Sequence, residues 1–419
     1  MFEEAVPTDR SAISDGKQRE VRRPRLSFID HALLRWMDGF LRRRAIGRLR
    51  ITMPTGATAI IGGDGLPMGP EIAFRSYRAF RLLAMRGAIG FADAYMDGDI
   101  DIPDLRAVFD FYLENEPAIV RAFPRLNDTR QGDRRFHVAR ANTVTGSRRN
   151  IADHYDLGNA FYSAWLDPSM LYSSAIFRSA ETTLEAAQRE KIDQIIDALQ
   201  LAPSHSLLEI GCGWGALVEA AAGRAARIRA ITISEQQLAA ARERVARTEF
   251  SDRVDVAFED YRATSGTYDR IVSIEMIEAV GEDNWPLFFE TIARRLAPSG
   301  VAVIQAITIR EEAFEPYRRN PDFIQRHIFP GGMLPTVEIM RNRAGDAGLS
   351  FETIERFGAS YARTLAEWRK RFVAAWPQIE ALGFDERFRR MWLYYLIYCE
   401  VGFEQGLIDV GLYRLRRPT

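Results

Sequence analysis

The order of apolar and polar residues changes near residue 149 and divides the chain into two parts. Beyond that point, short apolar runs alternate with stretches whose apolar residues recur at helical spacing. The pattern predicts strands at 206–210, 228–233, 253–258, 270–274 and 301–309, and helices at 216–223, 235–247 and 284–296. Such alternation is typical of a parallel sheet with helices on both faces, so we expect an α/β domain over residues 149–419.

The part before residue 149 has shorter and less regular elements. We expect an amphipathic helix at 31–44, a hairpin of strands at 48–53 and 57–61, and short helices at 77–85 and 91–96. These elements predict a small α+β domain over residues 27–125. The polar residues 1–26 are expected to form a disordered tail, and the arginine-rich residues 126–148 a linker.

Charge is distributed unevenly between the two parts. Residues 1–150 hold 25 Lys and Arg against 19 Asp and Glu, a net charge of +6, whereas the whole chain has a net charge of −1. The excess comes from arginines, among them Arg42, Arg43, Arg44, Arg48, Arg50, Arg134, Arg135, Arg140, Arg148 and Arg149. They form either an ordinary solvated surface or a contact with anionic lipid headgroups or nucleic acid.

Other features bound the class of protein. Two cysteines, Cys212 and Cys399, cannot build a disulfide framework, and five histidines show no metal-ligand spacing. The acidic N-terminus lacks the pattern of a signal peptide, and the apolar stretches are too short to span a bilayer. We therefore expect a cytoplasmic protein without a bound metal that associates at most peripherally with the inner face of the membrane.

A glycine-rich turn follows the first predicted strand of the α/β domain and reads Glu209-Ile-Gly-Cys-Gly-Trp-Gly215. Gly211, Gly213 and Gly215 let the backbone turn tightly and approach a ligand closely, and the following helix N-terminus favours an anion. The spacing differs from that of dinucleotide sites, and a carboxylate fits it better than a pyrophosphate. The turn resembles motif I of class I methyltransferases, which bind S-adenosylmethionine (SAM).

Further candidates stand at the carboxyl ends of the later strands, where ligands bind in such sheets. They are Thr232, Ser234, Gln237, Asp260, Tyr261, Glu275 and Gln305. Thr232 and Gln237 are expected to bond the ribose hydroxyls, because the second strand lacks the acidic residue that usually does so. Asp260 and Tyr261 suit the adenine amino group and ring, or else are a helix cap and a core aromatic.

Beyond these residues, the chain resembles the cyclopropane-fatty-acid synthase family of SAM-dependent lipid methyltransferases. The resemblance covers about 149–415 and, more weakly, 30–120. It rests on segments in the family's order: 150–159, Phe161-Tyr162, Leu166-Asp167, Tyr172-Ser173, 208–215, 231–237, 269–281, 329–335, 357–361, Trp368 and Ala375-Trp376. It implies a class I, Rossmann-like methyltransferase domain in which Glu209, Tyr172 and Ser173 also contact SAM. His154 is then a hydrogen-bonding residue at the SAM pocket or a general base.

The family's chemistry implies a second site. A methyl group passes from SAM to a cis double bond in a phospholipid acyl chain, and bound bicarbonate removes a proton from the resulting carbocation to close a cyclopropane ring. Carried over by position, the bicarbonate cradle is Ser174, Glu278, Gln305, Ile307 and Tyr361. Ser174 replaces a usual cysteine, and Gln305 replaces a histidine found in many members. Both can still bond a carbonate oxygen.

Alternatives remain at this stage. The altered residues at 174 and 305 keep open a sibling reaction that gives methyl- or methylene-branched chains, and the arginines suggest a nucleic-acid methyltransferase. No nucleic-acid motif supports the latter, so we expect an unsaturated phospholipid and an anionic membrane surface as partners, and no nucleic acid.

Apolar residues around Pro330 line an acyl channel or form core: Phe323, Ile324, Ile328, Phe329, Met333 and Leu334. The small domain either dimerises the protein into a homodimer or docks it on the bilayer.

Overall fold

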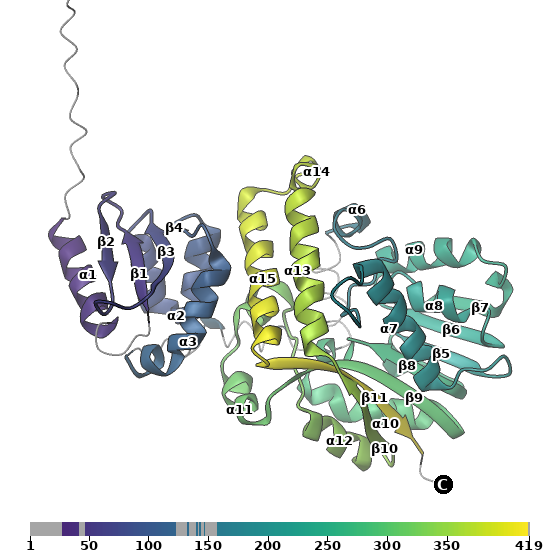
Figure 1. Ribbon diagram of the computed structural model, residues 1–419. Coiled ribbons are helices and arrows are strands. Elements are labelled where there is room, and N and C mark those ends of the chain that lie inside the picture. Colours follow the sequence, from purple (N-terminus) through teal and green to yellow (C-terminus); the bar gives the residue numbers. More distant parts are fainter. Residues whose placement is uncertain are drawn as a thin grey trace, which may run out of the picture.

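The computed structural model describes residues 27–41, 47–122, 132–133, 140, 142–143, 146 and 157–417. These residues form two units, each built on its own sheet, with the smaller N-terminal unit on the left in Figure 1. The predicted tail, most of the predicted linker and His154 lie outside the described residues.

The N-terminal unit contains a four-stranded sheet in the order β2-β1-β3-β4. Its elements are α1 (Phe28–Leu41), β1 (Arg48–Thr52), β2 (Thr58–Ile61), β3 (Met68–Phe74), α2 (Arg78–Met96), β4 (Ile100–Asp101) and α3 (Leu105–Ala122). The predicted hairpin is confirmed, because β1 and β2 pair antiparallel with Leu49 opposite Ile61. The sequence pattern missed β3, β4 and α3.

Two helices of this unit begin or bend for local reasons. Helix α1 starts three residues earlier than predicted because Ser27 and Asp30 cap it reciprocally: the Ser27 N–H donates to the Asp30 carboxylate at 2.8 Å, and the Asp30 N–H donates to the Ser27 hydroxyl at 3.1 Å. The two short helices predicted around residues 77–96 are both part of α2, which is interrupted at Gly87, where φ is 54°. Glycine tolerates that conformation, so the helix can change direction there.

The larger unit contains a seven-stranded sheet in the order β10-β11-β9-β8-β5-β6-β7. Its strands are β5 (Ser206–Ile210), β6 (Arg227–Thr232), β7 (Val254–Phe258), β8 (Tyr268–Ile274), β9 (Leu296–Ile309), β10 (Ser350–Arg356) and β11 (Ile408–Arg416). The five predicted strands pair in parallel, as expected. The pattern missed β10 and β11: β11 pairs antiparallel with β9, and β10 pairs antiparallel with β11 at the edge of the sheet.

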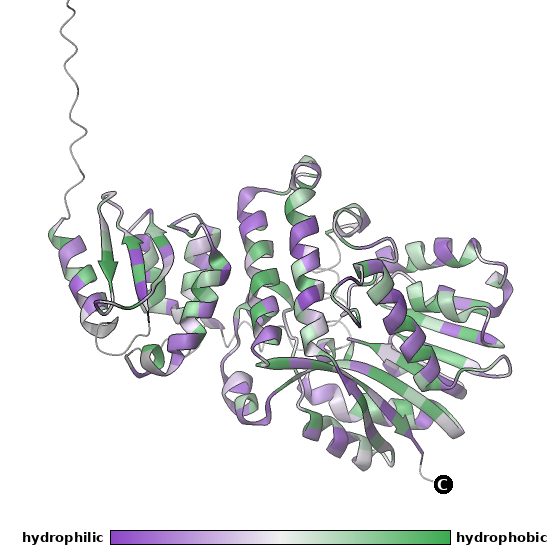
Figure 2. Cartoon of the chain, in the orientation of Figure 1, coloured by the Kyte–Doolittle hydropathy of each residue, from purple (hydrophilic) through white to green (hydrophobic). Residues whose placement is uncertain are grey.

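Helices cover both faces of this sheet, as Figure 1 shows. They are α6 (Asn159–Ser163), α7 (Leu184–Leu199), α8 (Ala216–Ala221), α9 (Glu235–Ala246), α10 (Trp285–Arg295), α11 (Glu311–Arg319), α12 (Val337–Asp346), α13 (Gly358–Ala374), α14 (Trp376–Ala381) and α15 (Glu386–Glu404). The central strands carry apolar residues on both faces, as a sheet covered on both sides requires, and Figure 2 shows them mostly green. Leu207 and Leu208, adjacent in β5, are both fully buried.

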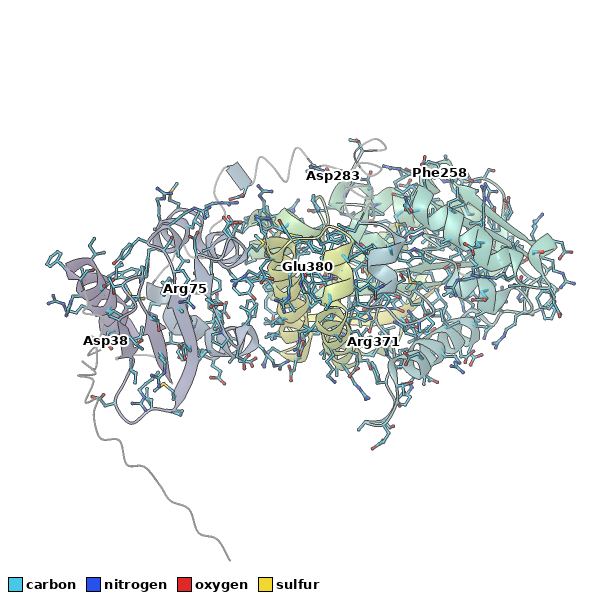
Figure 3. All side chains as sticks on the ribbon, turned by 90° about the horizontal axis from the view of Figure 1, so that it is seen from above. Asp38, Arg75, Phe258, Asp283, Arg371 and Glu380 are labelled. Carbon is cyan, nitrogen blue, oxygen red and sulfur yellow. The ribbon has the colours of Figure 1, made fainter. Side chains whose placement is uncertain are left out.

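Helix α15 joins the two units, because it packs against α13 on one side and α2 and α3 on the other. Arg106 of α3 forms ion pairs with Glu400 and Glu404 of α15. The rings of Phe109 and Tyr394 meet edge to face at 5.0 Å between centroids. Seen from above in Figure 3, Asp38 lies toward one end of the molecule and Phe258 toward the other, with Glu380 between them. Among the described residues, no helix combines the length and the apolar character needed to cross a bilayer.

Candidate active site

The three glycines of the turn after β5 all have positive φ, but their surroundings differ. A side chain at Gly211 would meet Met276 at 3.0 Å, and one at Gly215 would meet Ala241 of α9 at 3.1 Å. A Cβ at Gly213 would meet nothing within 4 Å. Gly211 and Gly213 border a cavity, whereas Gly215 caps α8 and allows α9 to pack closely. Contact with a ligand, which we expected of all three, therefore fits Gly211 and Gly213 but not Gly215.

Glu209 places a carboxylate beneath this turn. It borders the same cavity, and its Oε2 atom has no hydrogen-bond partner among the described residues. Burial raises the pKa of this carboxyl well above its usual range, and the neighbouring ammonium of Lys191 opposes that rise. A cationic group in the cavity would satisfy this oxygen.

The residues expected at the ribose form one hydrogen-bonded group at the end of β6. The Thr232 hydroxyl donates to the Gln237 side-chain oxygen at 2.9 Å, and the Gln237 N–H donates to the Ser234 hydroxyl at 3.3 Å. Ser234 thereby caps α9. Thr232 and Gln237 border the cavity, so the structure brings together the residues that the sequence predicted there.

Asp260 and Tyr261 also border the cavity, but they have structural partners. The Asp260 carboxylate accepts two hydrogen bonds from the Arg262 guanidinium, at 2.9 and 2.7 Å, and caps the short helix Tyr261–Ala263. The Tyr261 ring packs edge to face against Phe288 at 5.7 Å. The cap and the core aromatic that we considered as alternatives are thus both present, and contact with an adenine stays a prediction.

Tyr172 and Ser173 lie at the cavity wall beside a lysine that the sequence pattern did not single out. Lys191 of α7 is fully buried, and its ammonium donates to the Ser173 hydroxyl at 2.6 Å. Burial lowers the pKa of Lys191 to about 8, while Glu275, Asp167 and Glu209 oppose the shift. A single lysine within an amphipathic helix gives no sign in the sequence that it faces three carboxylates.

The most extensive polar cluster surrounds Glu275, which directly follows β8. Its Oε1 atom accepts from the Ser174 N–H at 2.8 Å and from the Gln305 side-chain amide at 2.6 Å, and its Oε2 atom accepts from the Tyr361 hydroxyl at 2.7 Å. The backbone is held as well: the Glu275 N–H donates to the Gln305 carbonyl at 2.8 Å, and φ is 47°. Left-handed backbone at a residue other than glycine is rare and is often found at functional sites.

Glu278 lies three residues further on, in the short helix Ile277–Ala279, and has far fewer donors. The Ile307 N–H donates to its Oε1 atom at 2.5 Å, and its Oε2 atom has no partner among the described residues. Burial, together with the negative charge of Glu275, raises the pKa of Glu278 to about 8. A negative charge shared by the pair is therefore favoured on Glu275, which has three donors, over Glu278.

The residues expected to form a bicarbonate cradle are arranged around Glu275. Ser174, Gln305 and Tyr361 donate to a side chain of the protein itself, and the Ser174 hydroxyl points instead to the Ala175 carbonyl. Ser174 and Gln305 do not border the cavity, because they lie behind Glu275. The sequence showed Glu275 only as a residue at a strand end and could not show which donors meet there. Gln305 itself lies before the end of β9, level with the end of β8.

The cavity has a volume of about 1140 Å³ and borders both units. Single small-molecule sites occupy roughly 300–1,000 Å³, so it has room for more than one ligand. Glu275, Glu278, Ile307 and Tyr361 line one region of it, next to the glycine turn. Apolar residues of the N-terminal unit line the far region, among them Trp36, Ile51, Ile72, Phe74 and Phe109. Five of the six residues proposed for an acyl channel line it too, the exception being Ile328.

Comparison with known proteins identifies what the chain is similar to. Residues 143–412 match the family described as mycolic acid cyclopropane synthetase. The chain is 38% identical over 375 residues to tuberculostearic acid methyltransferase of Mycobacterium tuberculosis, with 85% of each chain covered. It is 34% identical over 352 residues to cyclopropane-fatty-acyl-phospholipid synthase of Escherichia coli, with 82% of this chain and 87% of that one covered.

A solved structure agrees with these matches. The crystal structure of mycolic acid cyclopropane synthase CmaA1, complexed with SAH and CTAB, superposes with a TM-score of 0.60 at 32% identity. The superposition covers 64% of this chain and 98% of that one. The predicted α/β architecture of the larger unit is thereby confirmed.

Proposed function

The chain belongs to the mycolic acid cyclopropane synthetase family and has the class I methyltransferase fold, and on this premise we propose that it methylates an acyl chain. In this proposal a methyl group of SAM is transferred to the cis double bond of an unsaturated acyl chain carried by a membrane phospholipid. The family assignment agrees with the resemblance seen in the sequence. Relatives named as methyltransferases and as cyclopropane synthases are both compatible with this chemistry.

The observation that carries the proposal is the continuity of one cavity. It joins the glycine turn to the carboxylates of Glu275 and Glu278, which follow β8, and then to apolar walls in the N-terminal unit. An alkene is a weak, uncharged nucleophile, so the reaction requires a dry site that holds it in line with the methyl donor. The apolar walls suit an acyl chain, and the polar end suits the donor.

The residues around the glycine turn fit SAM. The open space at Gly213 admits a ligand against the backbone, and the unpartnered Oε2 atom of Glu209 suits a cationic amino group. Thr232 and Gln237 offer hydroxyl and amide groups at the position expected for the ribose. When bound there, SAM would supply an electrophilic methyl group.

Aromatic side chains at the cavity suit the positive charge that methyl transfer leaves on the acyl chain. The rings of Tyr361 and Phe403 stack with their centroids 4.3 Å apart. The hydroxyls of Tyr172 and Tyr395 are hydrogen-bonded to each other at 2.8 Å. All four line the cavity. Their ring faces can stabilise a carbocation as they stabilise other cations.

A phospholipid substrate requires contact with a membrane, which we place at the N-terminal unit. Helix α1 exposes Phe28, Ile29 and Trp36, with exposed fractions of 85%, 55% and 59%. Trp36 also borders the cavity, so this surface lies beside the apolar end of the proposed acyl site. Apolar side chains of this kind insert at the level of lipid headgroups.

Two products are compatible with the proposal. Loss of a proton from the added methyl group gives a cyclopropane, whereas loss from another carbon after a hydride shift gives a branched chain. Two observations favour the branched product. The donors expected for bicarbonate are engaged with Glu275, and the chain is similar to a tuberculostearic acid methyltransferase. Bicarbonate does not fit a site with these donors occupied, so no step is assigned to it.

The test is to supply the purified protein with SAM and vesicles of an unsaturated phospholipid. We expect release of S-adenosylhomocysteine together with a gain of one carbon in the acyl chain by mass spectrometry. Proton NMR then separates a cyclopropane from a methylene-branched isomer of equal mass. Absence of any acyl product, with SAM bound, would exclude the proposed reaction.

A further inference from the structure

Glu275 stands where the reaction needs an anion. A carbocation must lose a proton to a base inside a dry pocket, and the side chains that the resemblance assigned to a bicarbonate are arranged around this carboxylate instead. Three donors reach it, from Ser174, Gln305 and Tyr361, and it borders the cavity beside Tyr361. The carboxylate therefore occupies the place of the predicted ion and faces the proposed acyl chain.

The three hydrogen bonds favour the ionised form of Glu275 over that of its neighbour. Burial raises the pKa of Glu275, but the Tyr361 hydroxyl, the Ser174 N–H, the charge of Lys191 and the Gln305 amide all act in the opposite direction. Glu278 has one donor and an unpartnered oxygen. Two carboxylates so close cannot both be ionised easily, so the negative charge settles on the residue with more donors.

We propose that Glu275 is the base of this enzyme and takes the place of a bound bicarbonate. The inference rests on the proposed methyl transfer. After the new C–C bond has formed and the S–CH3 bond has broken, a C–H bond of the cationic acyl chain breaks. Its electron pair closes the ring or forms a double bond, its proton binds to Glu275, and the acyl chain becomes neutral.

The surroundings of Glu275 also explain why a protein carboxylate can serve next to a carbocation. A loosely held carboxylate would attack the cation and form an ester. Both oxygens of Glu275 already accept hydrogen bonds, and its backbone N–H is bonded to Gln305. These contacts fix the distance of the carboxylate from the chain and lower its nucleophilicity, while a proton can still bind to it.

The experiment compares the wild type with Glu275→Gln and Glu275→Gly in buffer depleted of bicarbonate. Wild-type product formation should be unchanged by depletion. Glu275→Gln keeps the shape of the side chain but cannot accept the proton, so product formation should fall about 10²–10⁴-fold, with SAM affinity by calorimetry retained. Glu275→Gly suits the positive φ of this position and leaves the three donors facing an empty space. Added bicarbonate should therefore restore part of its activity, and should not restore Glu275→Gln.

Glu282→Gln is the matched control, because this half-buried carboxylate seven residues away pairs with Arg318 outside the cavity. It should keep wild-type activity. The inference is overturned if wild-type activity requires bicarbonate, if Glu275→Gln stays active, or if bicarbonate fails to rescue a folded Glu275→Gly. A wild type that binds SAM but never forms an acyl product would instead refute the proposed function.

Discussion

Single residues at the ends of β5 and β8 set what this cavity can hold. Gly213 leaves room for a ligand at the backbone, Glu209 presents an unpartnered oxygen, and Glu275 presents a carboxylate held by three donors. Each is a local consequence of a strand that ends inside the molecule. The chemistry of the site therefore depends on a few side chains whose replacement has specific, measurable effects.

Gly213→Val should abolish SAM binding in calorimetry. Its φ is 52° and a Cβ there would meet nothing within 4 Å, so the new side chain would fill ligand space rather than clash with the protein. Gly348→Val is the control for backbone strain, because Gly348 has φ of 75° and equally open surroundings outside the cavity. Both variants should lose roughly 1–3 kcal/mol of stability. If they bind SAM equally well, Gly213 does not contact it.

Glu278→Gln should change how stability depends on pH. The folded-state pKa of Glu278, about 8, lies above its ordinary value of 4.5, so the folded state binds the proton more tightly. The contribution of this group is fully present below pH 4.5 and is lost as the pH rises to about 8, at up to roughly 1.4 kcal/mol per pH unit. In denaturant titrations from pH 5 to 8, the variant should lose less stability than the wild type. If the stability of the variant and of the wild type depends on pH in the same way, the raised pKa of Glu278 is contradicted.

At the scale of elements, helix α15 decides how the two units meet. It carries Glu400 and Tyr394 toward α3 of the N-terminal unit, and Tyr395 and Cys399 toward the cavity. Arg390 of the same helix donates to the carbonyls of Tyr95 and Ile100 at 3.2 and 3.1 Å. The walls of the cavity are thus held together by helix packing across the junction.

Arg106→Ala should disturb this junction more than the SAM site. Glu400 is 3% exposed and pairs with both Arg106 and Arg369, so removing Arg106 leaves a buried carboxylate with one partner. We expect a loss of about 1–3 kcal/mol in unfolding experiments. Product formation should fall further than SAM affinity, because the acyl walls come from both units. Arg121→Ala, on the exposed last turn of α3, should change neither the stability nor product formation. Equal effects of the two variants would argue against the junction.

At the scale of the whole molecule, the two ends differ in the apolar side chains that they expose. The N-terminal unit exposes Phe28, Ile29 and Trp36 on α1 next to an apolar arm of the cavity, while Phe258 lies toward the opposite end of the molecule (Figure 3). Residues 1–150 also carry the net positive charge. These features support the membrane contact that we propose at the end of the molecule that carries α1.

The full-length protein should therefore bind vesicles containing anionic phospholipid and bind less as salt is added. Screening acts over roughly 8–10 Å at physiological ionic strength, so exposed arginines lose their attraction first. Phe28→Ser combined with Trp36→Ser should reduce binding in flotation experiments, whereas Phe258→Ser should not. If vesicle binding changes neither with salt nor with the substitutions in α1, the membrane contact lies elsewhere.

The sequence by itself determined the α/β unit, its five parallel strands and the residues at their ends. Apolar periodicity is a local signal, and strands buried on both faces produce it strongly in β5, β6 and β8. The glycine turn and the group around Thr232 followed for the same reason, because short segments adjacent in sequence form them. Strands β10 and β11 were missed because each pairs with a strand far along the chain, β11 with β9 and β10 with β11.

Only the tertiary structure decided which side chains meet. Ser174, Glu275, Gln305 and Tyr361 come from four separate segments, and no spacing in the sequence shows that three of them donate to the fourth. The burial of Lys191 and the shared wall of the cavity likewise depend on how helices pack. Hydrogen bonds and electrostatic interactions depend on distance in space, so a contact between residues a hundred positions apart leaves no periodic trace in the sequence.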